Sequence, residues 1–152
     1  MHGRSPIALC SRPGPLRQRR DLAVVADTAD PVQVRGALES LPSDGALLVD
    51  DIDLLDDPAL LDGIESAMRR LRDGGGLVVL AGTTEAMAAS FRGPVAHARR
   101  ARTGLLLRPE GAHDGDLLGV RLRRRPAHSD PPGRGVLAVH GRAVPVQVPD
   151  PT

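Results

Sequence analysis

Apolar residues form short runs and a helical stripe along the first forty residues, separated by Pro, Gly and charged positions. Ile7 to Cys10 and Leu22 to Ala26 are apolar runs of strand length, bounded by Pro, Gly or Arg. Asp30 followed by Pro31 predicts the start of a helix, because an acidic cap and a proline at the first position favour initiation. The apolar positions of this helix recur on one face: Val34, Ala37, Leu38 and Leu41. We therefore predict two strands followed by an amphipathic helix.

A second strand and helix follow directly. Ala46 to Val49 is an apolar run that ends abruptly in two adjacent carboxylates, Asp50 and Asp51. The pair Asp57-Pro58 repeats the cap signal and predicts a longer helix. The apolar stripe of this helix is Leu60, Ile64, Ala67, Met68 and Leu71.

The second half of the chain has weaker signals. Gly74 to Gly76 end the long helix, and Leu77 to Ala81 then predicts a buried strand, since it contains almost no polar residue. The remaining expected features are a short helix opened by Gly82-Thr83-Thr84 and running through Phe91, a loss of helical signal after Gly93-Pro94, a strand at 105–107, and two short strands within 135–148. Because strands and helices alternate, we predict an α/β fold with a parallel sheet, in one domain without an internal linker.

Composition narrows the class of protein. The 152 residues are 41% hydrophobic with a net charge of +1, which supports one folded domain and gives no general reason for avid binding to nucleic acid or anionic membranes. The single cysteine, Cys10, excludes an internal disulfide, and we expect a buried thiol in a reducing compartment. No apolar stretch approaches the roughly 20 residues of a membrane span, and Pro6 to Cys10 is too short for a signal peptide. We therefore expect a cytoplasmic protein.

The adjacent carboxylates Asp50 and Asp51 carry the clearest chemical signal. A parallel sheet presents charged groups to ligands at the carboxyl ends of its strands. In nucleotide hydrolases this Walker B arrangement lets one carboxylate hold Mg²⁺ while the second polarises the attacking water. The alternative is an ordinary strand-to-loop transition with helix-capping acids. A phosphate loop of the form G-x-x-x-x-G-K-[ST] does not occur, because all 20 Lys plus Arg residues are Arg.

Six segments form an ordered set of motifs. They are Pro13 to Leu16, Ala46 to Asp53, Gly76 to Thr84, Thr103 to Leu107, Asp116 to Val120 and Pro132 to Gly135. The most specific combination is LLVDDIDLL, GLVVLAGTTEAM, TGLLLRPE followed by GDLLGVRL, and PPGRG. In this order and spacing the chain resembles the later part of an FtsK/SpoIIIE-type ATPase domain, in particular of actinobacterial members. That family consists of P-loop motors that move DNA or, in type VII secretion systems, drive protein export, usually as hexameric rings.

The resemblance implies a nucleotide site with ATP and Mg²⁺ as cofactors. By it, Asp50 would hold the metal, Asp51 would orient the attacking water and Thr83 would sense the γ-phosphate, which makes Asp51 and Thr83 the catalytic residues. Arg134, in the Pro-Gly-Arg-Gly turn, matches a motif of the cofactor site whose role stays open. The resemblance also implies self-association or a larger ATPase ring, DNA or secretion-complex proteins as partners, and a place at the inner face of the membrane through such partners.

The chain departs from the family at its start. The glycine-rich loop and its lysine precede the matched region in the family, so by the resemblance this chain begins at the second strand. The fold expected is a three-layer, RecA-like P-loop NTPase sheet without its first strand and phosphate loop. The missing strand lies beside the sensor strand in this fold type, and its absence leaves an unpaired edge lined by Leu77, Val79 and Ala81. We therefore expect a fragment, a mis-started reading frame or a degenerate domain that is inactive alone.

Other candidate residues have structural as well as functional interpretations. Thr83 and Thr84 are also suitable caps for the helix that follows them. Arg99, Arg100 and Arg102 either supply an arginine finger or form a solvated face. A second positive patch, which would contact phosphate or acidic protein, consists of Arg121, Arg123, Arg124 and Arg125. Two hypotheses remain: part of an FtsK/SpoIIIE motor, or a non-catalytic, degenerate ATPase-fold module for protein interaction.

Overall fold

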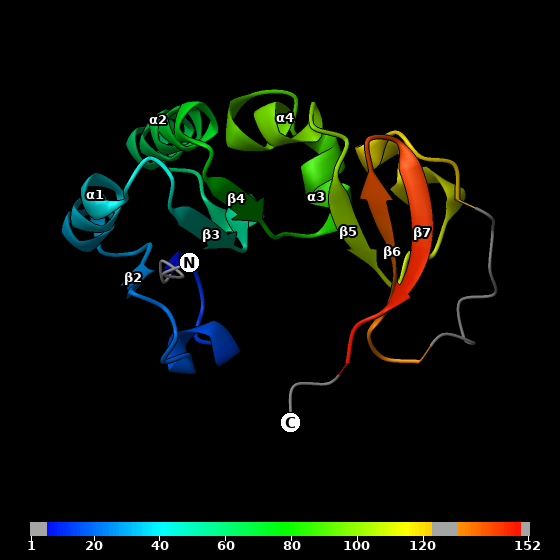
Figure 1. Ribbon diagram of the computed structural model, residues 1–152, viewed down its shortest axis with the longest axis horizontal. Coiled ribbons are helices and arrows are strands. Elements are labelled where there is room, and N and C mark those ends of the chain that lie inside the picture. The colour runs from blue at the N-terminus through cyan, green and yellow to red at the C-terminus, as the bar shows by residue number, and fades with distance from the viewer. Residues whose placement is uncertain (1–5, 123–130, 150–152) are drawn as a thin grey trace. The chain divides into compact units, whose positions relative to one another are not determined.

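The chain forms two compact units, each built around its own sheet (Figure 1). The computed structural model describes residues 6–122 and 131–149. The first unit comprises Met1–Thr83 with Arg92–Val95, and the second comprises Thr84–Phe91 with Ala96–Thr152. The sequence predicts one domain without a linker, so this division into units is a feature that the hydrophobic pattern does not reveal. Among the described residues, no helix is long and apolar enough to cross a membrane.

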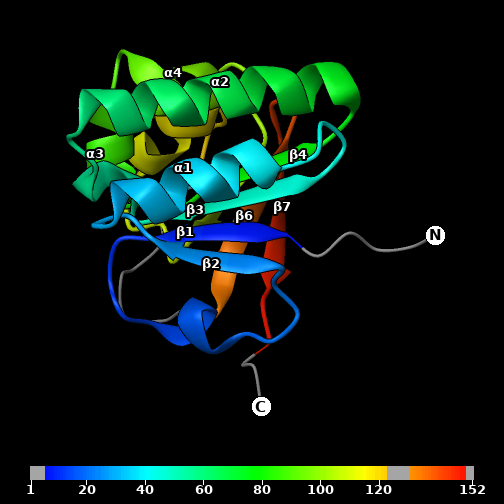
Figure 2. The same cartoon turned by 90° about the vertical axis from the view of Figure 1, so that its left-hand side faces the viewer.

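The first unit is an α/β structure with a four-stranded parallel sheet in the order β2-β1-β3-β4. Its elements are β1 (Ile7–Cys10), η1 (Pro15–Gln18), β2 (Val24–Asp27), α1 (Pro31–Ser40), β3 (Ala46–Asp50), η2 (Ile52–Leu54), α2 (Pro58–Gly74) and β4 (Leu77–Leu80). The predicted parallel α/β sheet is thus confirmed. Figure 2 shows α1 and α2 on the same face of this sheet, whereas the three-layer prediction requires helices on both faces.

The two long helices begin and end where the sequence predicts. The carboxylate of Asp30 accepts hydrogen bonds from the backbone N–H groups of Val32 (3.1 Å) and Gln33 (3.0 Å), which caps α1. Asp57 caps α2 in the same way through the N–H of Ala59, at 2.9 Å. Gly75 ends α2 with a φ of 76°, a conformation that costs glycine nothing but strains other residues.

The core of the first unit lies between the sheet and its two helices. The apolar stripes of both helices are buried there, as predicted, except for Leu60, which is half-buried. The largest fully buried side chains come from two strands, β1 and β3, and from α2: Leu9, Leu47, Val49, Ile64 and Leu71. Burying aliphatic side chains of this size is the main favourable term in folding, at about 1.5–3 kcal/mol each. Cys10 is also buried, which confirms the expected buried thiol.

The strand β4 is an edge strand, and the prediction that it is buried is wrong. It pairs with β3 only, and two of its residues, Leu77 and Val79, are 58% and 44% exposed. Both belong to the same face of the strand, because side chains alternate along it. An apolar run of this length predicts a strand, but it does not distinguish a central strand from an edge strand. The unpaired edge that we expected from the resemblance is therefore present.

The second unit contains a three-stranded antiparallel sheet in the order β5-β6-β7. Its elements are α3 (Thr84–Ala89), β5 (Gly104–Leu107), η3 (Ala112–Leu118), β6 (Arg134–Val139) and β7 (Arg142–Gln147), which confirms the strands predicted in this region. The hairpin turn between β6 and β7 places both His140 (φ 49°) and Gly141 (φ 81°) in the left-handed region, as a tight two-residue turn requires. A small core lies beside this sheet: Leu106, Leu117, Leu118, Val120 and Ala138.

One helix was missed from the sequence. The segment after Gly93-Pro94, where the helical signal fades, forms α4 (Gly93–Arg99). Proline is compatible with the first turn of a helix, because the N–H that it lacks would have no partner there. The signal is weak because the helix is only seven residues long and has one large aliphatic side chain, that of Val95.

Candidate functional site

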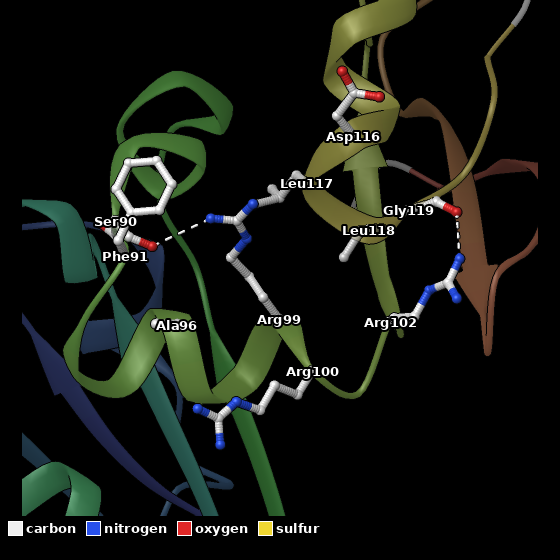
Figure 3. A pocket seen from close by; sticks show the side chains of 10 residues that line it. All are labelled: Ser90, Phe91, Ala96, Arg99, Arg100, Arg102, Asp116, Leu117, Leu118 and Gly119. Carbon is white, nitrogen blue, oxygen red and sulfur yellow. Dashed lines mark hydrogen bonds between the residues drawn. The ribbon is translucent and has the colours of Figure 1, made fainter.

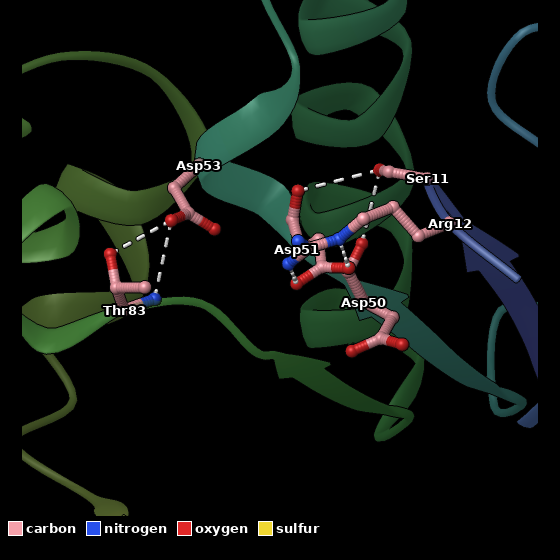
Figure 4. A network of polar contacts seen from close by, with 6 residues as sticks. All are labelled: Ser11, Arg12, Asp50, Asp51, Asp53 and Thr83. Carbon is pink, nitrogen blue, oxygen red and sulfur yellow. Dashed lines mark hydrogen bonds and ion pairs between the residues drawn. The ribbon is translucent and has the colours of Figure 1, made fainter. Parts of the chain in front are cut away.

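The carboxyl ends of β1 and β3 lie side by side in the middle of the parallel sheet. From β1 the chain passes to β2 on one side, and it then returns through α1 to β3 on the other side. Ligands of open α/β sheets bind at such a topological switch point, just outside the carboxyl ends of the strands. Here Ser11 and Arg12 follow β1, while Asp50 ends β3 and Asp51 follows it (Figure 4).

Asp50 presents a carboxylate that has no hydrogen-bond partner among the described residues. It is the last residue of β3, opposite Cys10 of β1, and is half-buried. The Ser11 hydroxyl donates to the backbone carbonyl oxygens of Asp50 (3.2 Å) and Asp51 (3.4 Å), which ties the two strand ends together. Within the described part of the chain, no group donates to the Asp50 side chain, and Figure 4 shows it pointing away from the Arg12 guanidinium. This carboxylate is therefore available to a ligand.

Asp51 is held by an arginine from the neighbouring strand end. Its backbone is left-handed (φ 51°, ψ 48°), a conformation that aspartate tolerates better than most residues. Arg12 donates from Nε to Oδ2 (2.8 Å) and from Nη2 to Oδ1 (2.6 Å), a two-point geometry that suits the planar guanidinium. These hydrogen bonds are the main reason that the pKa of Asp51 lies below its usual value. Asp51 stays ionised, but both of its oxygens are engaged by Arg12.

A second arginine and carboxylate pair lies at the same edge. Arg17, from η1, contacts the carboxylate of Asp27 at 2.8 Å and donates to the backbone carbonyl of Cys10 at 3.1 Å. The pKa of Asp27 is lowered, first by the hydrogen bond from the backbone N–H of Ala29 and then by Arg17. Both arginines at this edge are thus paired with carboxylates, and in the described structure neither Asp50 nor Asp53 is paired with a cation.

Thr83 is anchored by a residue that the sequence did not single out. Its hydroxyl donates to Oδ2 of Asp53 at 2.8 Å, and its backbone N–H donates to the same oxygen at 3.3 Å (Figure 4). Asp53 lies in η2, where the N–H of Ile52 donates to the carbonyl of Ala81 at 2.9 Å. The other carboxylate oxygen of Asp53, Oδ1, is buried and has no hydrogen-bond partner in the described structure. Thr83 is therefore fixed at the end of β4 by the segment that follows Asp50 and Asp51.

The four predicted site residues are divided between the two units. Asp50, Asp51 and Thr83 lie at the carboxyl edge of the parallel sheet, whereas Arg134 is the first residue of β6 in the second unit. The backbone carbonyl of Arg134 accepts from the N–H of Arg108 at 2.9 Å, and its Nε is buried without a partner in the described structure. Of the predicted patch at 121–125, residues 123–125 lie outside the described residues.

The sequence analysis missed Ser11, Arg12 and Asp53. Asp53 lies inside the LLVDDIDLL motif, three residues after Asp50, and its spacing from the strand end was an available signal. The Arg12 pairing had no such signal, because Arg12 and Asp51 are 39 residues apart and meet only through strand pairing.

The carboxylate oxygens at this edge suit a Mg²⁺ ion whose other ligands are water and phosphate, rather than a metal ion held by protein side chains alone. No cluster of three His, Cys, Asp or Glu residues able to hold a metal occurs among the described residues. Mg²⁺, however, commonly takes one or two protein carboxylates and keeps water molecules and phosphate oxygens as its other ligands. A single unpartnered carboxylate at a strand end, such as that of Asp50, matches this requirement.

Comparisons of the chain with protein-family models, with curated proteins and with solved structures give no match.

Proposed function

We propose that this chain is part of an ATP-binding motor domain of the FtsK/SpoIIIE type, and that it supplies the carboxylate that binds Mg²⁺ in the nucleotide site. The observation that carries this proposal is the unpartnered carboxylate of Asp50, which ends β3 at the switch point of the sheet. Thr83 follows the neighbouring strand β4, where the γ-phosphate sensor of such a motor belongs. The proposal covers DNA translocases and type VII secretion ATPases alike, because these residues contact nucleotide and not the transported polymer.

The charge of the edge makes a divalent cation necessary for this function. Among the described residues, Asp27, Asp50, Asp51 and Asp53 lie there with Arg12 and Arg17 as cations, so the formal charge is −2. A triphosphate alone would be repelled, and bound Mg²⁺ would neutralise both the carboxylate and the phosphate charge. In the proposed site Asp50 holds the ion.

Asp51 and Thr83 have other partners that a nucleotide must replace. For Asp51 to orient a water molecule, Arg12 has to leave it, and a phosphate group at this edge competes for the same guanidinium donors. Thr83 would redirect its hydroxyl from Asp53 to the γ-phosphate. No G-x-x-x-x-G-K-[ST] loop occurs in the 152 residues, so in the proposed motor the phosphate loop comes from outside this sequence.

The test is a nuclear magnetic resonance titration of the full chain with ATP, in the presence and absence of Mg²⁺. Because the phosphate loop is not part of this sequence, we expect weak binding, seen at millimolar ATP as Mg²⁺-dependent shifts of the backbone amides of Ser11, Asp51 and Thr83. In Asp50→Asn these shifts should disappear, because the substitution removes the charge and keeps the shape. The matched control is Asp62→Asn, since Asp62 is exposed on α2, away from the edge. Absence of shifts in the wild-type chain, or equal shifts in Asp50→Asn, would overturn the proposal.

A non-catalytic ATPase-fold module for protein interaction is the second candidate. The observation that favours it is the Arg12 and Asp51 pair, because it occupies the carboxylate that would orient the water. This candidate predicts a folded chain whose edge amides do not respond to ATP with Mg²⁺. The same titration therefore separates the two.

A further inference from the structure

The second unit has a groove of about 590 Å³ that is lined by three arginines and an exposed aromatic ring (Figure 3). We call it the arginine groove. Its lining comes from the end of α3, from α4 and the turn after it, and from η3. The residues used below are Phe91, Arg99, Arg100, Arg102, Asp116 and Leu117.

Arg99 is fixed in the groove by the end of a helix. Its Nη1 donates to the backbone carbonyls of Ala88 (3.0 Å) and Ser90 (3.2 Å), which lie at the carboxyl end of α3. This is a favourable place for a cation, because the last carbonyls of a helix have no partners within it. A guanidinium has five N–H donors, so Nε and Nη2 stay free to bind a ligand. Arg99 is thus a preorganised cation whose Nε and Nη2 have no partner in the described structure.

Arg102 is held in place by two glycines. Its backbone is left-handed (φ 48°), and its Nη2 donates to the carbonyl of Gly119 at 2.7 Å. A Cβ on Gly119 would lie 2.8 Å from Nε of Arg102, and one on Gly141 would lie 3.1 Å from Nη2. A side chain at either position would displace the guanidinium. The hydrogen bond to Gly119 and the close approach to both glycines therefore fix where this cation lies.

Arg100 provides the third cation and is free to move. Its side chain is exposed and contacts no partner in the described structure. Against these three cations the groove contains one carboxylate, Asp116, whose side chain is 78% exposed, so its formal charge is +2. Figure 3 shows the guanidiniums of Arg99, Arg100 and Arg102 at separate places rather than around one point. This spacing suits a ligand with several separated negative charges.

The remaining lining is apolar. Phe91 is the only aromatic residue of the chain and is 82% exposed, while Leu117 is 7% exposed and belongs to the core of this unit. Aromatic side chains, Phe among them, and arginines are enriched at protein interfaces. The groove therefore offers an apolar contact next to separated cations.

We propose that the arginine groove binds an extended acidic peptide segment of a partner protein, with carboxylates on the arginines and an aliphatic side chain on Phe91. The charge of the groove and its apolar lining are each complementary to such a segment. A single phosphate fits less well because the guanidiniums do not converge. A nucleic-acid strand fits less well because only one aromatic ring is present for base stacking. The inference is independent of the proposed function, since every lining residue belongs to the second unit.

The test measures the binding of three fluorescein-labelled probes to the full chain by fluorescence anisotropy at low salt. The first probe is a peptide that alternates Glu or Asp with Leu, the second is the same peptide with Gln and Asn in place of the acids, and the third is oligo(dT). We expect the acidic peptide to bind most tightly, and its Kd to rise with salt. Arg99 and Arg102 are not substituted, because their hydrogen bonds also support the fold.

Two variants locate the binding site. Arg100→Gln removes a charge without a structural partner, and we expect its Kd to rise about two- to fivefold, the range for an exposed ion pair. Phe91→Ser should also weaken binding of the acidic peptide. Arg35→Gln is the matched control, because Arg35 is an exposed arginine on α1 in the other unit, and its Kd should not change.

Four results would overturn the inference. They are no binding of the acidic peptide, equal binding of the neutral peptide, tighter binding of oligo(dT), and equal affinity in Arg100→Gln and wild type. A dimer in solution that Arg100→Gln dissociates would assign the groove to a second copy of the chain, which also overturns the inference of a separate partner. Light scattering after size-exclusion chromatography measures this outcome.

Discussion

The same substitution, glycine to alanine, should have opposite effects at the two helices of the first unit. Gly36 lies on the exposed face of α1, and a Cβ added there meets no atom within 4 Å. Gly74 is the last residue of α2, and a Cβ added there would press on the carbonyl oxygen of Ser43 and lie 2.6 Å from its carbonyl carbon. The two variants therefore separate helix propensity from packing.

The magnitudes follow from these distances. Gly36→Ala should raise the free energy of unfolding by about 0.5–1 kcal/mol, because alanine loses less backbone entropy than glycine in a helix. At Gly74 part of this gain remains, but overpacking against backbone atoms costs about 1–3 kcal/mol. Gly74→Ala should therefore lower the free energy of unfolding by about 1–2 kcal/mol. The two variants should differ by about 2 kcal/mol in total.

Urea denaturation followed by far-ultraviolet circular dichroism measures both effects, since the chain contains no Trp or Tyr for fluorescence. The midpoints should move in opposite directions with unchanged slopes. Gly75→Ala is a useful third variant: its φ of 76° strains alanine, but nothing lies within 4 Å of the added Cβ. It should cost about 1–2 kcal/mol through the backbone alone. Equal stabilisation by Gly36→Ala and Gly74→Ala would refute the packing of the α2 end against Ser43.

Three further predictions concern the cap of α1, the carboxyl edge and the buried thiol. Asp30→Ala removes the acceptor of two backbone N–H groups and should lower the free energy of unfolding by about 1 kcal/mol, measured in the same urea assay. Arg12→Gln should raise the pKa of Asp51 towards its usual value, and carbon-13 nuclear magnetic resonance of the carboxyl group during a pH titration measures this change. Folding lowers the pKa of Asp51, so the stability that the Arg12 and Asp51 pair contributes is present at neutral pH. It is lost as the pH falls through the lowered pKa. The Cys10 thiol, whose pKa is raised by burial and then by the Asp50 carboxylate, should react with a disulfide reagent much more slowly in the native chain than in urea, and equal rates would contradict its burial.

The sequence predicted the local elements of the first unit well, because their signals lie within a few residues. The caps Asp30 and Asp57 act on N–H groups two or three positions away, and the apolar stripes follow the period of a helix. The position of Asp50 at a strand end was predictable for the same reason. The helix α4 was not, since seven residues with one large aliphatic side chain give little periodic signal.

By itself, the sequence determined where the two long helices begin and end, roughly where the strands lie, and which carboxylates follow the strand β3. Only the tertiary structure decided which groups meet there. Arg12 reaches Asp51, and Thr83 reaches Asp53, across 39 and 30 residues, because β1 and β4 both pair with β3. Strand order also decided that β4 is exposed at an edge although its residues are apolar. The physical reason is that periodicity and capping act over one or two turns of the chain, whereas strand pairing and side-chain contacts depend on which distant segments the fold brings together.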